Sequence, residues 1–124
     1  MAAKENAADR YGGVTAGVSP HVAQILASLV RHETQIGSAR LQRSAVTSLG
    51  GSVPLLDNPS RHAAFAVLKA SDIPSVLVEM GFMSNQRDEA ALRQSAHRAT
   101  VAMALHHAID TYFASANRLT HIAG

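Results

Sequence analysis

The sequence predicts an α/β fold that forms the C-terminal part of a mixed sheet flanked by helices. Stretches with apolar residues at helical spacing lie on both sides of two short apolar runs that lack polar alternation. Runs of that kind fit strands covered on both faces. We therefore expect helices at about 20–49, 86–94 and 96–117, and strands at about 63–68 and 75–79.

Length and composition indicate one domain of modest size. The chain has 124 residues, of which 47% are hydrophobic and 16% are charged, and its formal net charge is +2. The Lys and Arg residues are too scattered for a nucleic-acid footprint, and no window approaches the roughly 20 apolar residues of a membrane span. The first residues carry charges where an export signal needs an apolar core. We expect no nucleic-acid partner, no membrane span and no export signal in this chain.

The first predicted helix begins at Ser19 and Pro20 and continues to the Gly50-Gly51 pair. Ser is a good N-cap, and Pro is tolerated at the first helical position because its missing N–H would be unpaired there. Glu33 and Arg40 fall on the apolar stripe of this helix. Three explanations are open: this part of the helix turns toward solvent, the charged ends of Glu33 and Arg40 snorkel at the edge of the core, or the helix face lines a polar cleft. The apolar residues at helical spacing are Val22, Ile25, Leu26, Leu29 and Ile36.

The two predicted strands are the apolar parts of A-A-F-A-V-L-K (63–69) and S-V-L-V-E (75–79). The connector between them is too short for a crossover helix. The strands would therefore pair directly in antiparallel fashion, or another strand would lie between them. Two strands alone would leave an unpaired sheet edge and an uncovered apolar face.

Two further helices are predicted after the second strand. Asn85 is the expected N-cap of the first of them, and Asp88 stands three residues later, where a capping-box acid would lie. The last helix has a coherent apolar stripe, so we expect it to pack against the rest of the domain. Residues 119–124 have the composition of a frayed tail. The stripe consists of Ala102, Leu105, Ile109, Tyr112 and Phe113.

The seven histidines of the chain raise the question of a metal site. A helical zinc site needs two His four residues apart and a third converging ligand, and no His pair here has that spacing. His106 and His107 are adjacent and point about 100° apart on a helix. We expect His106 to reach Asp110 and His107 to face outward. The residues thus predict no metal site, and they contain no phosphate-binding loop or nucleophile elbow.

Glu79 is the candidate catalytic residue. It ends the second predicted strand, and open α/β sheets deliver functional groups at the carboxyl ends of their strands. Apolar neighbours would desolvate the carboxylate, which suits a general base that acts on a water molecule. Two alternatives to this role are open: the Glu79 carboxylate is turned to solvent, or it is paired with Lys69.

The sequence A-F-A-V-L-K-A-S-D-I-P-S-V-L-V-E-M-G-F-M-S-N (64–85) resembles the last two strands of the zinc-dependent N-acetylmuramoyl-L-alanine amidases of bacterial cell-wall turnover. The similarity extends back to K-E-N-A-A-D-R-Y-G-G-V (4–14) and forward to the last helix. It implies a fragment of such an enzyme with three parts. These are the end of a regulatory insertion (1–18), the C-terminal part of the catalytic domain (19–118) and a tail (119–124).

The resemblance also implies a chemistry. In that family the Glu of V-L-V-E is the catalytic carboxylate, so Glu79 would deprotonate a zinc-bound water that attacks the amide between N-acetylmuramic acid and L-alanine. The family's zinc ligands belong to motifs that this sequence does not contain, so no histidine inherits that role and we expect no zinc bound by this chain alone. The histidines are His21, His32, His62, His97, His106, His107 and His121.

Substrate, location and partners follow from the same resemblance. The substrate would be peptidoglycan, the location would be the periplasm or cell envelope, and an activator protein would act through the regulatory segment. The alternative is an amidase-like binding or regulatory protein that performs no hydrolysis.

Overall fold

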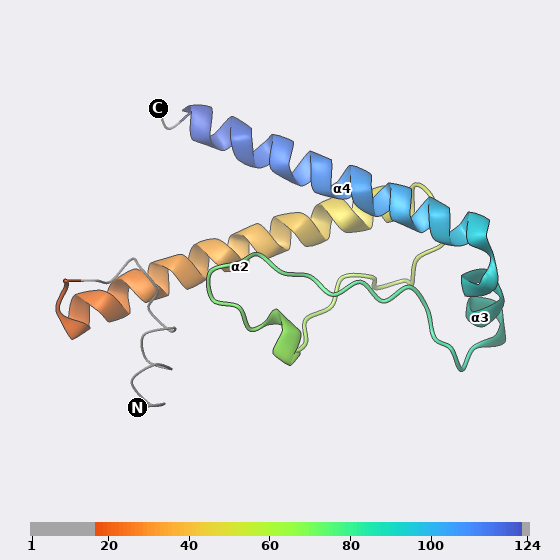
Figure 1. The fold of residues 1–124 in the computed structure, drawn as a ribbon, viewed down its shortest axis with the longest axis horizontal. Coiled ribbons are helices and arrows are strands. Elements are labelled where there is room, and N and C mark those ends of the chain that lie inside the picture. Colours follow the sequence, from red (N-terminus) through yellow and green to blue (C-terminus); the bar gives the residue numbers. More distant parts are fainter. Residues whose placement is uncertain (1–16, 123–124) are drawn as a thin grey trace.

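The computed structural model describes residues 17–122, in which two long helices form a hairpin-like pair and an extended linker runs beside the first of them (Figure 1). α4 (Ser95–Ile122) packs against α2 (Pro20–Gly50), and α3 (Gln86–Arg93) packs against α4. The two long helices converge near the end of α2 and diverge toward the start of α2 and the end of α4 (Figure 1). The three predicted helices are confirmed. A short 3₁₀ helix, η1, spans Ala66–Leu68.

The helix ends differ little from those predicted. Ser19 is the N-cap of α2, with its hydroxyl accepting from the Val22 N–H and Pro20 in the first turn. The tail predicted at 119–124 is helical as far as Ile122. The regulatory segment predicted at 1–18 lies almost wholly outside the described residues. None of the helices within 17–122 is long and apolar enough to cross a membrane.

The predicted mixed sheet is wrong for the described part of the chain, where the structure contains helices and no strand. The first expected strand, 63–68, contains η1, whose turn is closed by Leu68 N–H to Phe65 O at 3.0 Å. The second, 75–79, is irregular. A strand needs a neighbour for its N–H and C=O groups. Within residues 17–122 the two runs do not pair with each other or with another segment, so the α/β class does not apply to them.

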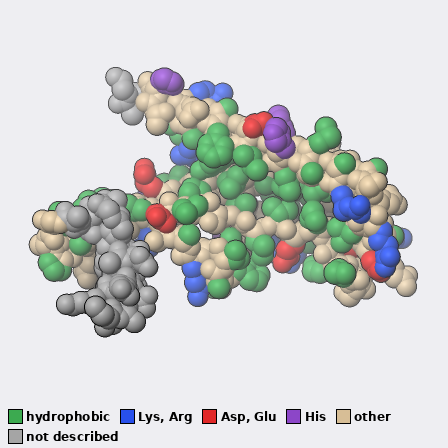
Figure 2. Space-filling model, viewed as in Figure 1, with side chains coloured by type: hydrophobic (Ala, Val, Ile, Leu, Met, Phe, Trp, Pro, Cys, Tyr) green, Lys and Arg blue, Asp and Glu red, His purple; other side chains and the backbone are tan. Residues whose placement is uncertain are grey.

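A small core lies where α2 and α4 converge. The buried apolar side chains are Ala45 and Leu49 of α2 and Val101, Ala104 and Ala108 of α4. Three of the five are alanines, which let the two helix backbones approach closely. Figure 2 shows hydrophobic side chains gathered between the two helices. Three half-buried side chains, Val53, Val78 and Leu105, pack against this cluster.

The predicted apolar stripes are mostly exposed. On α4, Leu105 and Tyr112 are half-buried as expected, but Ile109 and Phe113 are 48% and 58% exposed. The buried face of α4 is set by its smaller residues instead, because close approach of two helices requires short side chains at the contact. Most of the stripe on α2 is exposed as well. Its exposed members are Val22, Ile25, Leu29 and Ile36.

The two charged residues on the α2 stripe have different surroundings. Glu33 is exposed and Arg40 is half-buried. The exposed Ile36 lies between them on the same helix. The sequence left several interpretations of this helix face open. In the described residues, a face turned toward solvent fits better than a polar cleft.

Candidate functional site

Glu79 lies on an irregular segment, residues 73–85, that we name the Glu79 segment. It runs beside α2 and leads into α3 (Figure 1). Its first anchor is on α2, where the Ser75 N–H donates to the Ser38 Oγ at 2.9 Å. Pro74 packs against Gly37 of the same helix, so closely that a Cβ on this glycine would lie 2.7 Å from Pro74 Cγ. A hydrogen bond therefore holds the start of the segment, and the absence of a side chain at Gly37 lets Pro74 pack closely on α2.

Replacing Gly37 by alanine tests this first anchor. Alanine favours a helix over glycine by about 1 kcal/mol, but the new methyl group would overlap the Pro74 ring, which cannot rotate away. We expect the overlap to dominate and the free energy of unfolding to fall by about 1–3 kcal/mol. Urea unfolding followed by circular dichroism measures it, and faster hydrogen exchange of the Ser75 amide would show that the segment has moved.

Gly50→Ala is the matched control for this change. It is the same substitution on the same helix, but the nearest atom to a Cβ at Gly50 is Leu55 Cδ1 at 3.4 Å, an ordinary contact. We expect this variant to be neutral or slightly stabilised. Equal stability of Gly37→Ala and Gly50→Ala would contradict the close Pro74 contact.

The second anchor is the side chain next to Glu79. Val78 packs on the core cluster of Leu49, Val101 and Ala104. Val78 is half-buried against this cluster, whereas the next residue, Glu79, is exposed.

The third anchor is the turn into α3. Gly81 has φ +143°, and the Phe82 N–H after it donates to Asp88 Oδ2 at 2.9 Å. Asn85 is the N-cap, as predicted: its Oδ1 accepts from the backbone N–H groups of Arg87 at 3.0 Å and Asp88 at 3.1 Å. The capping-box role predicted for Asp88 is wrong, because the Asn85 N–H donates to the Phe82 carbonyl instead, at 3.0 Å. The Asp88 carboxylate is thereby free to hold the turn.

The surroundings of Glu79 differ from those expected of a dry strand end. The carboxylate is exposed, so the described residues do not desolvate it, and it forms no ion pair with Lys69. Of the predictions about histidines, two are confirmed. His106 Nδ1 lies 3.4 Å from Asp110 Oδ2, and His107 is exposed.

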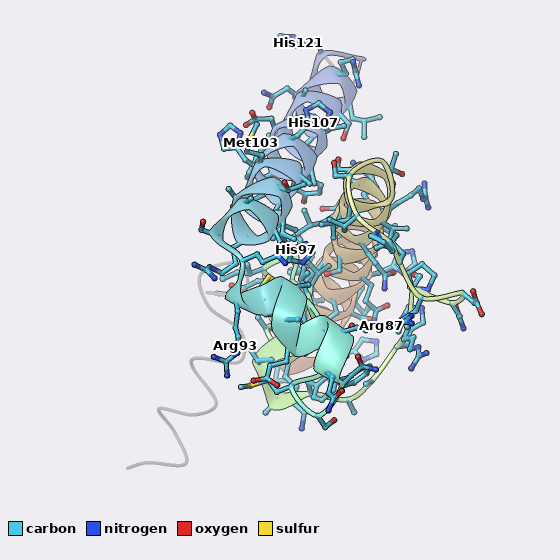
Figure 3. The ribbon with its side chains drawn as sticks, turned by 90° about the vertical axis from the view of Figure 1, so that its right-hand side faces the viewer. Arg87, Arg93, His97, Met103, His107 and His121 are labelled. Carbon is cyan, nitrogen blue, oxygen red and sulfur yellow. The ribbon has the colours of Figure 1, made fainter. Side chains whose placement is uncertain are left out.

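The described residues do not fit a zinc ion. A protein zinc site needs at least three converging His, Cys, Asp or Glu side chains, and no such group occurs within residues 17–122. Figure 3 shows the labelled histidines of α4, His97, His107 and His121, at separate levels along the helix rather than at one point. Neither the histidines nor Glu79 therefore form a metal centre in this part of the chain.

Sequence reasoning proposed Glu79 as the candidate catalytic residue but missed the residues that hold its segment. Ser38 and Gly37 contact a segment far along the chain, which no local pattern reveals. One signal was available for Gly37: a glycine inside a helical pattern commonly has a packing reason. For Asp88 the pattern gave the correct acid at the start of α3 with the wrong partner.

Comparison with known proteins identifies the family to which this chain is related. Residues 5–111 match the family model described as N-acetylmuramoyl-L-alanine amidase. The amidase AmiC of Escherichia coli O6:H1 is 35% identical over 114 residues, which are 92% of this chain and 27% of that protein. The amidase AmiA of Salmonella typhimurium is 34% identical over 91% of this chain and 39% of its own length. The probable cell wall amidase LytH of Staphylococcus epidermidis is 38% identical over 49% of this chain and 21% of its own length. No solved structure gives a significant match.

The match confirms the resemblance seen in the motif around Glu79. It includes the whole of α2, the Glu79 segment, α3 and more than half of α4. The chain spans about a quarter to two fifths of the length of AmiC and AmiA. It belongs to the N-acetylmuramoyl-L-alanine amidase family.

Proposed function

We propose that the chain is the C-terminal portion of the catalytic part of a peptidoglycan amidase, with Glu79 as its general base. The whole protein would hydrolyse the amide between N-acetylmuramic acid and L-alanine. One observation carries the proposal. Within the family match, Glu79 is an exposed carboxylate on a segment that is anchored before it, beside it and after it.

The chemistry assigned to Glu79 is proton transfer. Its carboxylate accepts a proton from the water that attacks the amide carbonyl carbon, and the same proton then passes to the leaving nitrogen of L-alanine. The carbon–nitrogen bond breaks, and the products are a free carboxyl group on the muramic acid and a free amine on the peptide. Exposure of Glu79 leaves it open to a glycopeptide substrate, and the anchors fix the position of its backbone.

The proposal also covers zinc binding and cellular location. The family is zinc-dependent, but residues 17–122 hold no ligand set for the ion, so we propose that this chain alone binds no zinc. Its proposed location is the periplasm or cell envelope, where peptidoglycan lies. An activator protein acting through residues 1–18 is part of the proposal, and those residues lie almost wholly outside the described part.

The decisive experiment supplies the missing metal ligands from a relative. We expect the 124-residue chain alone to release no dye from dye-labelled peptidoglycan and to hold no stoichiometric zinc. In a hybrid amidase, the part of this chain aligned with E. coli AmiC replaces the 114 aligned residues of that protein. We expect the hybrid to bind zinc and to release dye, because it joins Glu79 to the remaining segments of a family member.

Two outcomes would contradict this proposal. Zinc binding and dye release by the chain alone would show that it contains a complete site. A folded hybrid that holds zinc and binds peptidoglycan without dye release would favour the alternative of a non-catalytic amidase-like binding protein. That alternative draws its support from the missing ligand group in residues 17–122.

A further inference from the structure

The turn that follows Glu79 is held by α3. Three residues after Glu79, the Phe82 N–H donates to Asp88 Oδ2 at 2.9 Å. This bond joins the backbone of the Glu79 segment to a side chain of a helix. Hydrogen bonds from backbone N–H groups to an ionised carboxylate are among the stronger ones in proteins. The bond thus fixes the position of the backbone shortly after Glu79.

Gly81 and Asp88 also fit each other sterically. A Cβ on Gly81 would lie 3.1 Å from Asp88 Cβ and 3.2 Å from Asp88 Cγ, closer than most such contacts allow. Gly81 has φ +143°, a conformation that residues with a side chain rarely adopt. The missing side chain therefore lets the Asp88 side chain pack directly on the turn beside Glu79.

The side chain of Asp88 is itself held in place. Asp88 is half-buried, and its backbone N–H donates to Asn85 Oδ1 in the cap of α3. A carboxylate in the first turn of a helix is favoured by the helix dipole. Asp88 is consequently a fixed acceptor rather than a mobile surface acid.

We propose that Asp88 is a positioning residue for the Glu79 carboxylate. It does not contact the substrate; it acts through the Phe82 N–H and Gly81 and sets the direction of the backbone that carries Glu79. With Val78 held in the core on the other side, Glu79 lies between two fixed points. This inference rests on the proposed function of Glu79 and adds to it a residue that controls its placement.

The first test uses the 124-residue chain and needs no activity. Asp88→Ala removes the acceptor, and we expect hydrogen exchange of the Phe82 amide, followed by NMR, to become about tenfold faster or more. Asp88→Asn keeps an oxygen acceptor of the same shape and should retain slow exchange. Glu89→Ala is the matched control, because it removes the neighbouring first-turn acid, whose carboxylate bonds to Arg93 and not to the Phe82 N–H. Unchanged Phe82 exchange in Asp88→Ala would overturn the proposal.

The second test measures kcat and KM in the hybrid amidase. We expect Asp88→Ala to lower kcat by about 10- to 100-fold with KM within about twofold, because a misplaced base slows the chemical step more than substrate binding. Asp88→Asn should restore most of the kcat, and Glu89→Ala should leave it unchanged. If Asp88→Ala does not fold, Asp88→Ser replaces it, since a hydroxyl suits the first turn of a helix but is too short to reach Phe82.

The outcomes separate the two proposals. Full kcat in Asp88→Ala, in a hybrid that loses activity with Glu79→Gln, would overturn the positioning role and leave the proposed function standing. Full activity of Glu79→Gln would overturn the proposed function and, with it, any positioning of a base. The amide measurement would then still show whether Asp88 holds the turn.

Discussion

Glu79→Gln in the hybrid amidase is expected to lower kcat for dye release by about 100- to 10,000-fold, with little change in KM. Glutamine has nearly the same shape as glutamate and still forms hydrogen bonds, but it cannot accept the proton of the attacking water. The fold should be unaffected. Glu79 is exposed, and within residues 17–122 its side chain forms no hydrogen bond or ion pair that the substitution would break.

Glu33→Gln is the matched control. It makes the same chemical change at another exposed glutamate, on α2, and should leave kcat within about twofold. Zinc content and the helical circular dichroism signal of both variants should equal those of the parent hybrid. Dye release by Glu79→Gln at one third of the parent rate or more would contradict a general-base role. A large loss in Glu33→Gln would instead favour the polar cleft that the α2 sequence left open.

The helices were predictable because their signals are local. Ser19 and Asn85 each cap a helix by bonding to N–H groups two or three residues away, so a short stretch of sequence contains both partners. The strands were not predictable in the same way. An apolar run indicates that side chains avoid water, whereas a strand also needs a second backbone beside it. The described residues do not provide that backbone, so the run 75–79 is irregular and 63–68 includes η1.

The helix contact shows a second limit of sequence reasoning. The largest apolar residues of α2 and α4 suggested the core face, but the buried face is made mainly by small residues such as Ala45, Ala104 and Ala108. Which side of a helix is buried depends on how closely its partner can approach, and this is not a property of either helix alone. For the candidate site, the motif suggested Glu79, which stays a prediction. The anchor Ser38 lies 37 residues from Ser75 and carries no signal in the sequence.

Leu49→Ala is expected to lower the free energy of unfolding of the 124-residue chain by about 2–5 kcal/mol. Leu49 is 9% exposed and belongs to the cluster that joins α2 to α4. The described core contains only four other buried apolar residues, so few neighbours can move in to fill the cavity. A typical domain is stable by about 5–15 kcal/mol, and this single change would remove a large part of that. Urea unfolding by circular dichroism, repeated at several protein concentrations, measures the loss.

Leu56→Ala separates the core contribution from the general effect of shortening a leucine. Leu56 is 56% exposed, and its truncation should change the free energy of unfolding by about 0.5 kcal/mol or less. Because Val78 packs on the cluster that contains Leu49, the Leu49 variant should also speed hydrogen exchange at the Val78 amide, and the Leu56 variant should not. Equal losses in the two variants would mean that the convergence of α2 and α4 is not the core. In that case Val78 would not be an anchor of the Glu79 segment.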